Sequence, residues 1–95
     1  MSKGEVAERL RSSGYVFAPS RSGKRFWEQP GTGRRLPEDH AFTLVREEER
    51  QLLSEAGWAP EEIEGDAYWR KPDSGYLYPQ GPAADTLRAQ RDREA

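Results

Sequence analysis

The sequence predicts an α+β fold, a tandem duplication in which a helix plus a small antiparallel β-meander forms a unit of about 42 residues. Three observations predict it: an internal repeat, short apolar runs that alternate between helical and extended character, and a length of 95 residues. A chain of this length can form one small domain, whereas a unit of about 42 residues buries too little surface to be stable alone. We therefore expect the two copies to pack against each other as one compact domain.

The internal repeat is clearest in two segments that match at an offset of 42, FWEQPGTGRRLP at 26–37 and YWRKPDSGYLYP at 68–79. Each contains an aromatic residue, a Trp, a Pro, a Thr-Gly or Ser-Gly pair and a second Pro in the same order. Upstream, LRSSGY at 10–15 matches LSEAGW at 53–58 at an offset of 43. These matches in one register predict repeat one at about 3–46, repeat two at about 47–88 and a frayed tail at about 89–95.

The first predicted element is a helix at about residues 3–13. Ser2 and Glu5 have the spacing of a capping box, and a narrow apolar stripe leads to Gly14, a residue type that commonly ends a helix. From 15 to 37, aromatic and β-branched runs alternate with turns rich in Ser, Gly and Pro. This alternation predicts a small antiparallel meander.

The next predicted element is a helix from about 39 to 56, because apolar residues recur there at near-helical spacing and Gly57 follows. It is either one continuous helix or one that is bent or broken near Thr43. In repeat two we expect a loop around Pro60. The remaining expected elements of this repeat are strands at 66–70 and 76–78 and a helix that begins near Pro82 or Ala83.

Ten aromatic residues partly replace the few aliphatic side chains, and the repeated Trp27 and Trp69 are the predicted centre of the core. A role in stacking against a ligand is the alternative for these two residues.

The charge distribution is the main functional indication. The net charge of −2 conceals an asymmetry, because the chain up to Arg46 has nine basic and five acidic residues, a net charge of +4. The remainder has six basic and twelve acidic residues, a net charge of −6. In repeat one the basic residues fall in the turns and beside aromatic residues, a composition typical of protein surfaces that bind nucleic acid. Solvated basic turns without a ligand are the alternative.

The order of an aromatic strand, a Pro-x-Thr/Ser-Gly turn, a short strand and a helix with an early Ala resembles several small DNA-binding modules. These are the arm-binding domain of tyrosine recombinases, the ethylene-response-factor domain of plants and the methyl-CpG-binding domain, each a three-stranded sheet plus a helix. The resemblance covers 14 to about 45 and, more weakly, 57 to about 89. Those families place the sheet in the major groove. The resemblance therefore implies that these residues face DNA: Arg25, Trp27, Arg34 and Arg35.

Other classes of function have little support in the sequence. There is no Cys, which removes disulfides and thiolate chemistry and favours a cytoplasmic location, and no apolar run is long enough to span a membrane. The single His40 beside Asp39 has no nucleophile near it, and the acidic clusters lack the spacing of a metal site. We expect no enzyme, no metal, no cofactor, no small-molecule substrate and no membrane association.

Two functional hypotheses remain, and homodimerisation through packing of one copy on another is a third. The first is DNA binding through the basic repeat one, by Arg21, Lys24, Arg25, Trp27, Arg34 and Arg35. The second is a regulatory or inhibitory interaction with a protein, through the acidic repeat two and its exposed aromatic residues Trp58, Tyr76 and Tyr78. The placement of basic residues on the hairpins favours the first.

Overall fold

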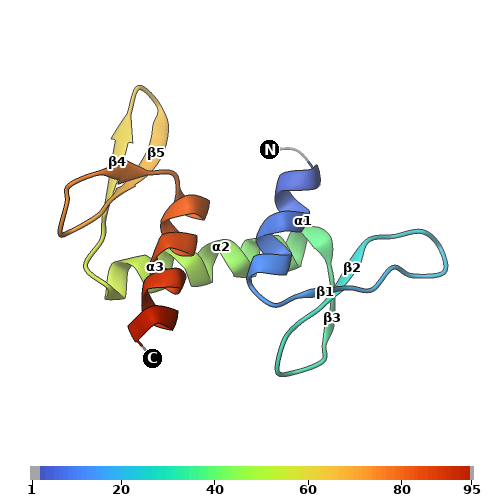
Figure 1. Ribbon diagram of the computed structural model, residues 1–95. Helices are drawn as coiled ribbons and strands as arrows, with labels where there is room; N and C mark the ends of the chain where they lie inside the picture. The colour runs from blue at the N-terminus through green and yellow to red at the C-terminus, as the bar shows by residue number, and fades with distance from the viewer. Residues whose placement is uncertain (1–2, 95) are drawn as a thin grey trace. The chain divides into compact units, whose positions relative to one another are not determined.

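The computed structural model describes residues 3–94 and has two compact units, Met1–Glu47 (unit 1) and Glu48–Ala95 (unit 2), as Figure 1 shows. The described residues form three α-helices and six β-strands. In chain order these are α1 (Lys3–Ser12), β1 (Val16–Phe17), β2 (Phe26–Glu28), β3 (Arg35–Pro37), α2 (Glu38–Glu55), β4 (Ala59–Ile63), β5 (Asp66–Arg70), β6 (Leu77–Tyr78) and α3 (Gln80–Glu94). The predicted α+β class is confirmed. The predicted cap residue Ser2 lies outside the described residues.

The first three strands form an antiparallel sheet in the order β1-β2-β3. Trp27 is the central residue of this sheet, opposite Phe17 on one side and Leu36 on the other. Cross-strand partners share one face of a sheet, so these three side chains point the same way. Trp27 and Leu36 are buried there with residues of α1 and α2, among them Leu10 and Val45.

The last three strands form a second antiparallel sheet, in the order β4-β5-β6. Trp69 holds the central place, opposite Pro60 and Tyr78. It is buried with Leu53 of α2 and Leu87 of α3. Trp27 and Trp69 therefore each centre a separate cluster of buried residues instead of one shared core. Packing of the two units as one domain stays a prediction.

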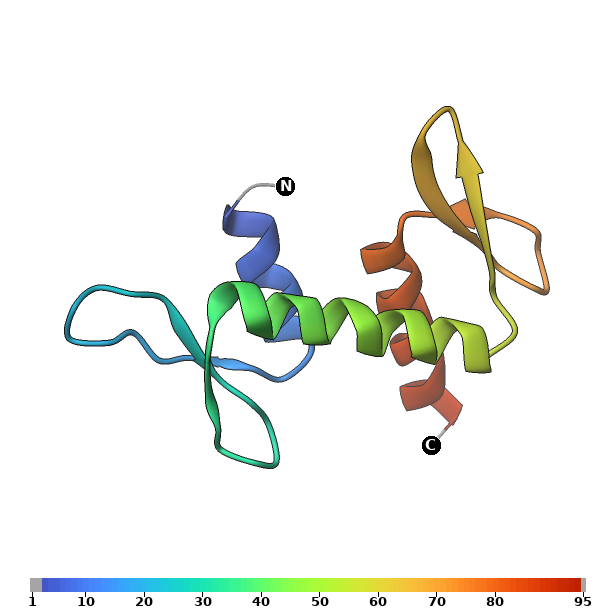
Figure 2. The same cartoon turned by 180° about the vertical axis from the view of Figure 1, so that it is seen from behind.

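Helix α2 spans 18 residues. Its ribbon is unbroken in both views, so the predicted alternative of a helix broken near Thr43 is wrong (Figures 1 and 2). Its fully buried Ala41, Val45 and Leu53 face the clusters. Glu49 belongs to the same stripe and is only 2% exposed, which the charge of the residue did not indicate.

Three further boundaries differ from the prediction, and the smallest difference is that strand β6 begins at Leu77 and not at Tyr76. Residues 59–63 form strand β4 and not a loop, because β4 is an edge strand, where a Pro such as Pro60 and acidic residues are tolerated. Helix α3 begins at Gln80 and continues to Glu94, so the described part of the predicted frayed tail is helical. Basic residues Arg91 and Arg93 in the last turn favour this extension through the helix dipole.

Both units end a helix in the same way. The N–H of Tyr15 donates to the carbonyl of Leu10 at 3.0 Å, and the N–H of Trp58 donates to that of Leu53 at 3.0 Å. The intervening glycines have φ angles of 88° (Gly14) and 87° (Gly57), which glycine adopts without steric cost. The repeated motifs thus have matching local structures, while their origin by duplication stays a prediction.

No helix within residues 3–94 is long and apolar enough to cross a membrane.

Candidate functional site

In unit 1 two arginine side chains flank a pair of aromatic rings. The rings of Phe17 and Trp27 lie 5.2 Å apart, tilted by 59°. The guanidinium carbon of Arg25 lies 4.6 Å from the centre of the Phe17 ring, and that of Arg11 lies 5.7 Å from the centre of the Trp27 ring. Both arginines are in the range of cation–π attraction. We call these four residues the arginine–aromatic ladder.

Glu38, the first residue of α2, fixes this ladder. Its Oε2 accepts a hydrogen bond from the indole Nε1 of Trp27 at 2.8 Å and another from Nε of Arg25 at 2.7 Å. The Glu38 side chain is only 14% exposed, whereas that of Arg25 is 39% exposed. One carboxylate therefore supplies the acceptor that the buried indole needs and restrains the partly exposed guanidinium, which has four N–H donors besides the one at Nε.

The ladder exposes its members unequally. Trp27 is fully buried and Phe17 is 37% exposed. Trp27 offers no surface to a ligand, which corrects the expectation from the resemblance that it faces DNA. It supports Phe17 from behind, and the accessible part of the ladder consists of Phe17, Arg25 and Arg11.

Arg21 and Lys24 lie in the loop between β1 and β2, directly before Arg25, and both are exposed. The loop is held closed because the N–H of Ser20 donates to the carbonyl of Lys24 at 3.1 Å, and the N–H of Lys24 donates to Ser20 Oγ at 3.2 Å. Gly23 takes the left-handed φ of 82° that the tip of this loop requires. The loop thus has two exposed cations that lie close to Arg25 of the ladder along the sequence.

Arg34 and Arg35 are exposed but occupy other places. Arg34 lies in the turn between β2 and β3, and Arg35 is the strand partner of Glu28. Alternation along a strand puts Glu28 and Arg35 on the face opposite to Trp27, whereas Arg25 contacts the Trp27 side through Phe17. The predicted set of six residues therefore does not form one face.

In unit 2 the three predicted partner-binding residues also differ in exposure. Tyr76 is 68% exposed, whereas Trp58 is buried and packs on the ring of half-buried Tyr78 with centroids 5.7 Å apart. The expectation of an exposed Trp58 is wrong, because the residue belongs to the cluster around Trp69.

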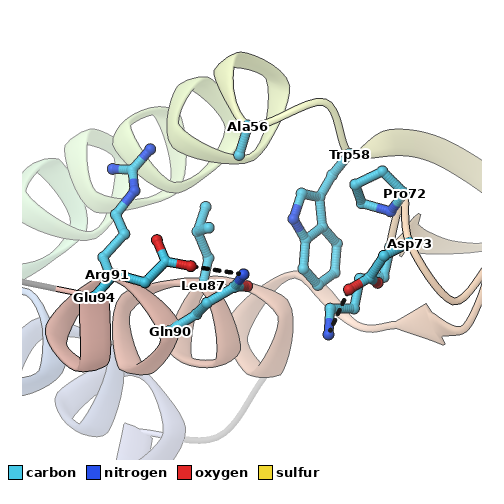
Figure 3. Close-up of a pocket in the computed structure, with 9 residues that line it drawn as sticks. Ala56, Trp58, Pro72, Asp73, Leu87, Gln90, Arg91 and Glu94 are labelled. Carbon is cyan, nitrogen blue, oxygen red and sulfur yellow. Dashed lines mark hydrogen bonds and ion pairs between the residues drawn. The ribbon is translucent and has the colours of Figure 1, made fainter.

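Trp58 nevertheless lines a hollow of about 300 Å³ in unit 2, between the turn after β5 and the end of α3 (Figure 3). Its rim carries paired charges and amides, since Lys71 Nζ lies 3.5 Å from Asp73 Oδ2 and Gln90 donates to Glu94 at 3.4 Å. The lining residues are Ala56, Trp58, Lys71, Pro72, Asp73, Leu87, Gln90, Arg91 and Glu94.

The acidic edge strand β4 has one carboxylate that is paired tightly. Arg70 donates from Nε and Nη2 to the two oxygens of Glu61, both at 2.7 Å, and from Nη1 to the carbonyl of Gly75 at 2.6 Å. The hydrogen bond from Arg70 lowers the pKa of Glu61 below its ordinary value, against a smaller opposing effect of burial. Glu61 is therefore a structural partner of Arg70 within the sheet.

The site residues predicted from the sequence did not include Arg11 and Glu38, and they left out Phe17 although it is one of the aromatic residues beside the basic side chains. The repeat contained a signal for Glu38, because Gln80 stands at the same offset of 42 that relates the two Trp residues. His40 is exposed on α2. Within residues 3–94, no group of three or more His, Asp or Glu side chains could hold a metal ion.

Comparisons with protein-family models, curated proteins and solved structures find no match for this chain.

Proposed function

We propose that the protein binds nucleic acid through unit 1, with the ladder and the loop of residues 18–25 as the contact surface. The observation that carries the proposal is the fixed guanidinium of Arg25, which lies on an exposed aromatic ring directly after a loop with two exposed cations. Proteins usually bind single-stranded nucleic acid with cations that contact the phosphates and with aromatic side chains that stack on the bases.

The contact surface in this proposal differs from that of the sheet modules that the sequence resembles. Those modules place their sheet in the major groove, and the strand face of this chain that is free to do so is the one opposite to Trp27. In this chain that face carries Val16, Glu28 and Arg35, so it has one acidic side chain for its one basic side chain. A carboxylate there would repel phosphates, which favours contact at the ladder and not at the outer strand face.

The test is fluorescence anisotropy of labelled oligonucleotides at low salt with two charge-matched double variants. Arg21→Ala with Lys24→Ala removes two cations beside the ladder, and we expect a loss of affinity of about tenfold or more because both act on phosphates. Arg34→Ala with Arg35→Ala removes the same charge elsewhere and should have a much smaller effect. Equal losses would contradict the assigned surface, and absence of binding by the wild-type chain would reject the function.

A second candidate function is docking of a basic protein surface on unit 2, which the hollow beside Trp58 favours. Asp73 and Glu94 stand at its rim, and an indole at its wall can take an arginine or lysine side chain by cation–π attraction. The excess of acidic residues in the second half of the chain would attract such a partner.

This second function can be tested with a short peptide of alternating Arg and Gly, by following the indole N–H signal of Trp58 in NMR spectra. Asp73→Lys with Glu94→Lys should abolish the shift of this signal. Glu62→Lys with Glu64→Lys changes the charge equally in the β4–β5 hairpin and should preserve it. If both double variants abolish the shift to the same extent, the peptide is held by long-range charge attraction, and the hollow is rejected as the docking site.

A further inference from the structure

We infer that the guanidinium of Arg25 is a stacking platform for an unpaired nucleobase, so that unit 1 takes single-stranded nucleic acid. The inference rests on the proposed nucleic-acid binding and names its substrate class. It is carried by three features: the ring beneath Arg25, the restraint by Glu38 and the cations on either side of Arg25.

The ring of Phe17 supports the guanidinium from one side. Arg25 Cζ lies 4.6 Å from the ring centre, and the side chain of Arg25 is still 39% exposed. Phe17 in turn rests on the fully buried Trp27. A guanidinium that lies over an aromatic ring and is still partly exposed can take another planar group, and nucleobases commonly stack on arginine planes.

The bond to Glu38 holds this plane before any ligand arrives. An arginine side chain ordinarily loses the rotational freedom of several bonds when it is immobilised in a complex, and this loss opposes binding. Here the 2.7 Å bond from Nε to Glu38 and the contact with Phe17 restrict the side chain in the free protein. A base that stacks on Arg25 therefore meets an ordered surface.

The phosphates of the same strand would meet cations next to this platform. Arg21 and Lys24 precede Arg25 in the closed loop, and Arg11 lies at the other end of the ladder. A strand that places one base on Arg25 can thus bring its backbone to positive charge.

Single strands fit this arrangement better than duplexes. In a duplex each base is already stacked between its neighbours, so its face reaches the platform only after unstacking. The strand face that would enter a groove has Glu28 beside Arg35, as described above. A single strand needs neither unstacking nor that face.

The experiment compares three labelled probes of equal length by anisotropy: an oligothymidine, an abasic oligonucleotide with the same number of phosphates, and a duplex. We expect the wild-type chain to bind the oligothymidine about tenfold tighter than the abasic probe, since only the oligothymidine has bases that can stack on Arg25. The Arg25→Lys variant keeps the charge and a partner for Glu38 but has no planar group. It should bind both single-stranded probes with the same affinity, that of wild type for the abasic probe.

Arg46→Lys is the matched control, because Arg46 also lies over a phenylalanine, 5.8 Å from the ring centre of Phe42. This variant should preserve the tenfold preference. Phe17→Ala removes the ring beneath the platform and should reduce the preference while the cations remain.

The possible results separate the two proposals. Equal binding of the oligothymidine and the abasic probe by wild type, tighter binding of the duplex, or a preference that survives Arg25→Lys would overturn the stacking platform. Binding of the probes through phosphates alone would leave the proposed function standing. If wild type binds none of the probes at low salt, the proposed function fails, and the stacking platform fails with it.

Discussion

The indole nitrogen of Trp27 donates to the carboxylate of Glu38, eleven residues further along the chain, at 2.8 Å. The indole nitrogen of Trp69 donates to Oε1 of Gln80, also eleven residues on, at 3.3 Å. Each acceptor is the first residue of the helix that follows the sheet. The same connection therefore ties sheet to helix in both units, and only in unit 1 does its acceptor carry a charge that also restrains an arginine.

We predict that Glu38→Ala and Glu38→Gln destabilise unit 1 to different extents. The alanine variant leaves the buried indole N–H of Trp27 without its acceptor, which should lower the free energy of unfolding by about 1–3 kcal/mol. The glutamine variant keeps an acceptor, as Gln80 does for Trp69, and loses only the charge beside Arg25. It should cost less than about 1 kcal/mol, because the Arg25 side chain is more than one third exposed.

Urea unfolding followed by tryptophan fluorescence measures both variants. Asp39→Asn is the control. Asp39 also lies in the first turn of α2, so the variant loses the same favourable interaction between a carboxylate and the helix dipole as the Glu38 variants do. Equal effects of Glu38→Ala and Asp39→Asn would mean that the bond to Trp27 contributes little.

The sequence was sufficient for the elements whose signals are local. The boundary of α1 follows from Gly14, and strand β5 was predicted with its observed limits because an aromatic run ends at a turn with Pro, Ser and Gly. Strand β4 could not be predicted, since its Pro and acidic residues are disfavoured in strands and are tolerated there only because β4 lies at a sheet edge.

The candidate site was predictable only in part, because its geometry depends on the pairing of distant strands. Basic character in the loops could be seen in the sequence, but the contact of Arg25 with Phe17 depends on the register that sets Phe17 opposite Trp27. The alternation of side chains then separates Arg25 from Arg35, although the residues have similar surroundings in the sequence. A count of nearby charges could not make this distinction.

We predict that Glu64→Asn stabilises unit 2. Glu64 has a φ of 53° in the two-residue turn between β4 and β5, and Gly65 follows with a φ of 86°. A turn with two left-handed residues favours Asn-Gly, and a residue other than Gly or Asn is strained there by about 1 kcal/mol or more. The free energy of unfolding should therefore rise by about 1 kcal/mol.

Thermal unfolding can check this gain against Glu62→Asn, which removes the same charge from an exposed position within strand β4. That variant has no left-handed residue to relieve and should give no gain, because Asn is disfavoured in strands. If both variants stabilise unit 2 equally, relief of acidic repulsion and not of backbone strain would be the cause.

We predict that the bond between Glu61 and Arg70 gives unit 2 an acid-sensitive contribution to its stability. The pKa of Glu61 in the folded chain lies below the ordinary value of 4.5, so the unfolded chain takes up this proton at a higher pH. The contribution is therefore present above pH 4.5 and is lost as the pH falls through the folded-state pKa. Unfolding midpoints in urea at a series of pH values should show wild type and Glu61→Gln converging below pH 4.5.

Glu62→Gln is the control for this acid dependence. Glu62 is exposed in the same strand, and among the described residues Arg70 pairs with Glu61 and not with Glu62. This variant should run parallel to wild type over the same range. A constant difference between wild type and Glu61→Gln down to the lowest pH would show that charge on Glu61 does not stabilise the fold.

The last prediction concerns the salt dependence of nucleic-acid binding. If Arg21 and Lys24 each neutralise one phosphate of a single strand, their joint removal should make the slope of log affinity against log salt about 1.4 less steep, since each contact contributes about 0.7. Arg25→Lys keeps its charge and should leave the slope unchanged even where it lowers affinity. Titrations of an oligothymidine at several salt concentrations measure both slopes. A change of slope in Arg25→Lys would mean that Arg25 acts on a phosphate, whereas an unchanged slope in the double variant would remove Arg21 and Lys24 from the contact surface.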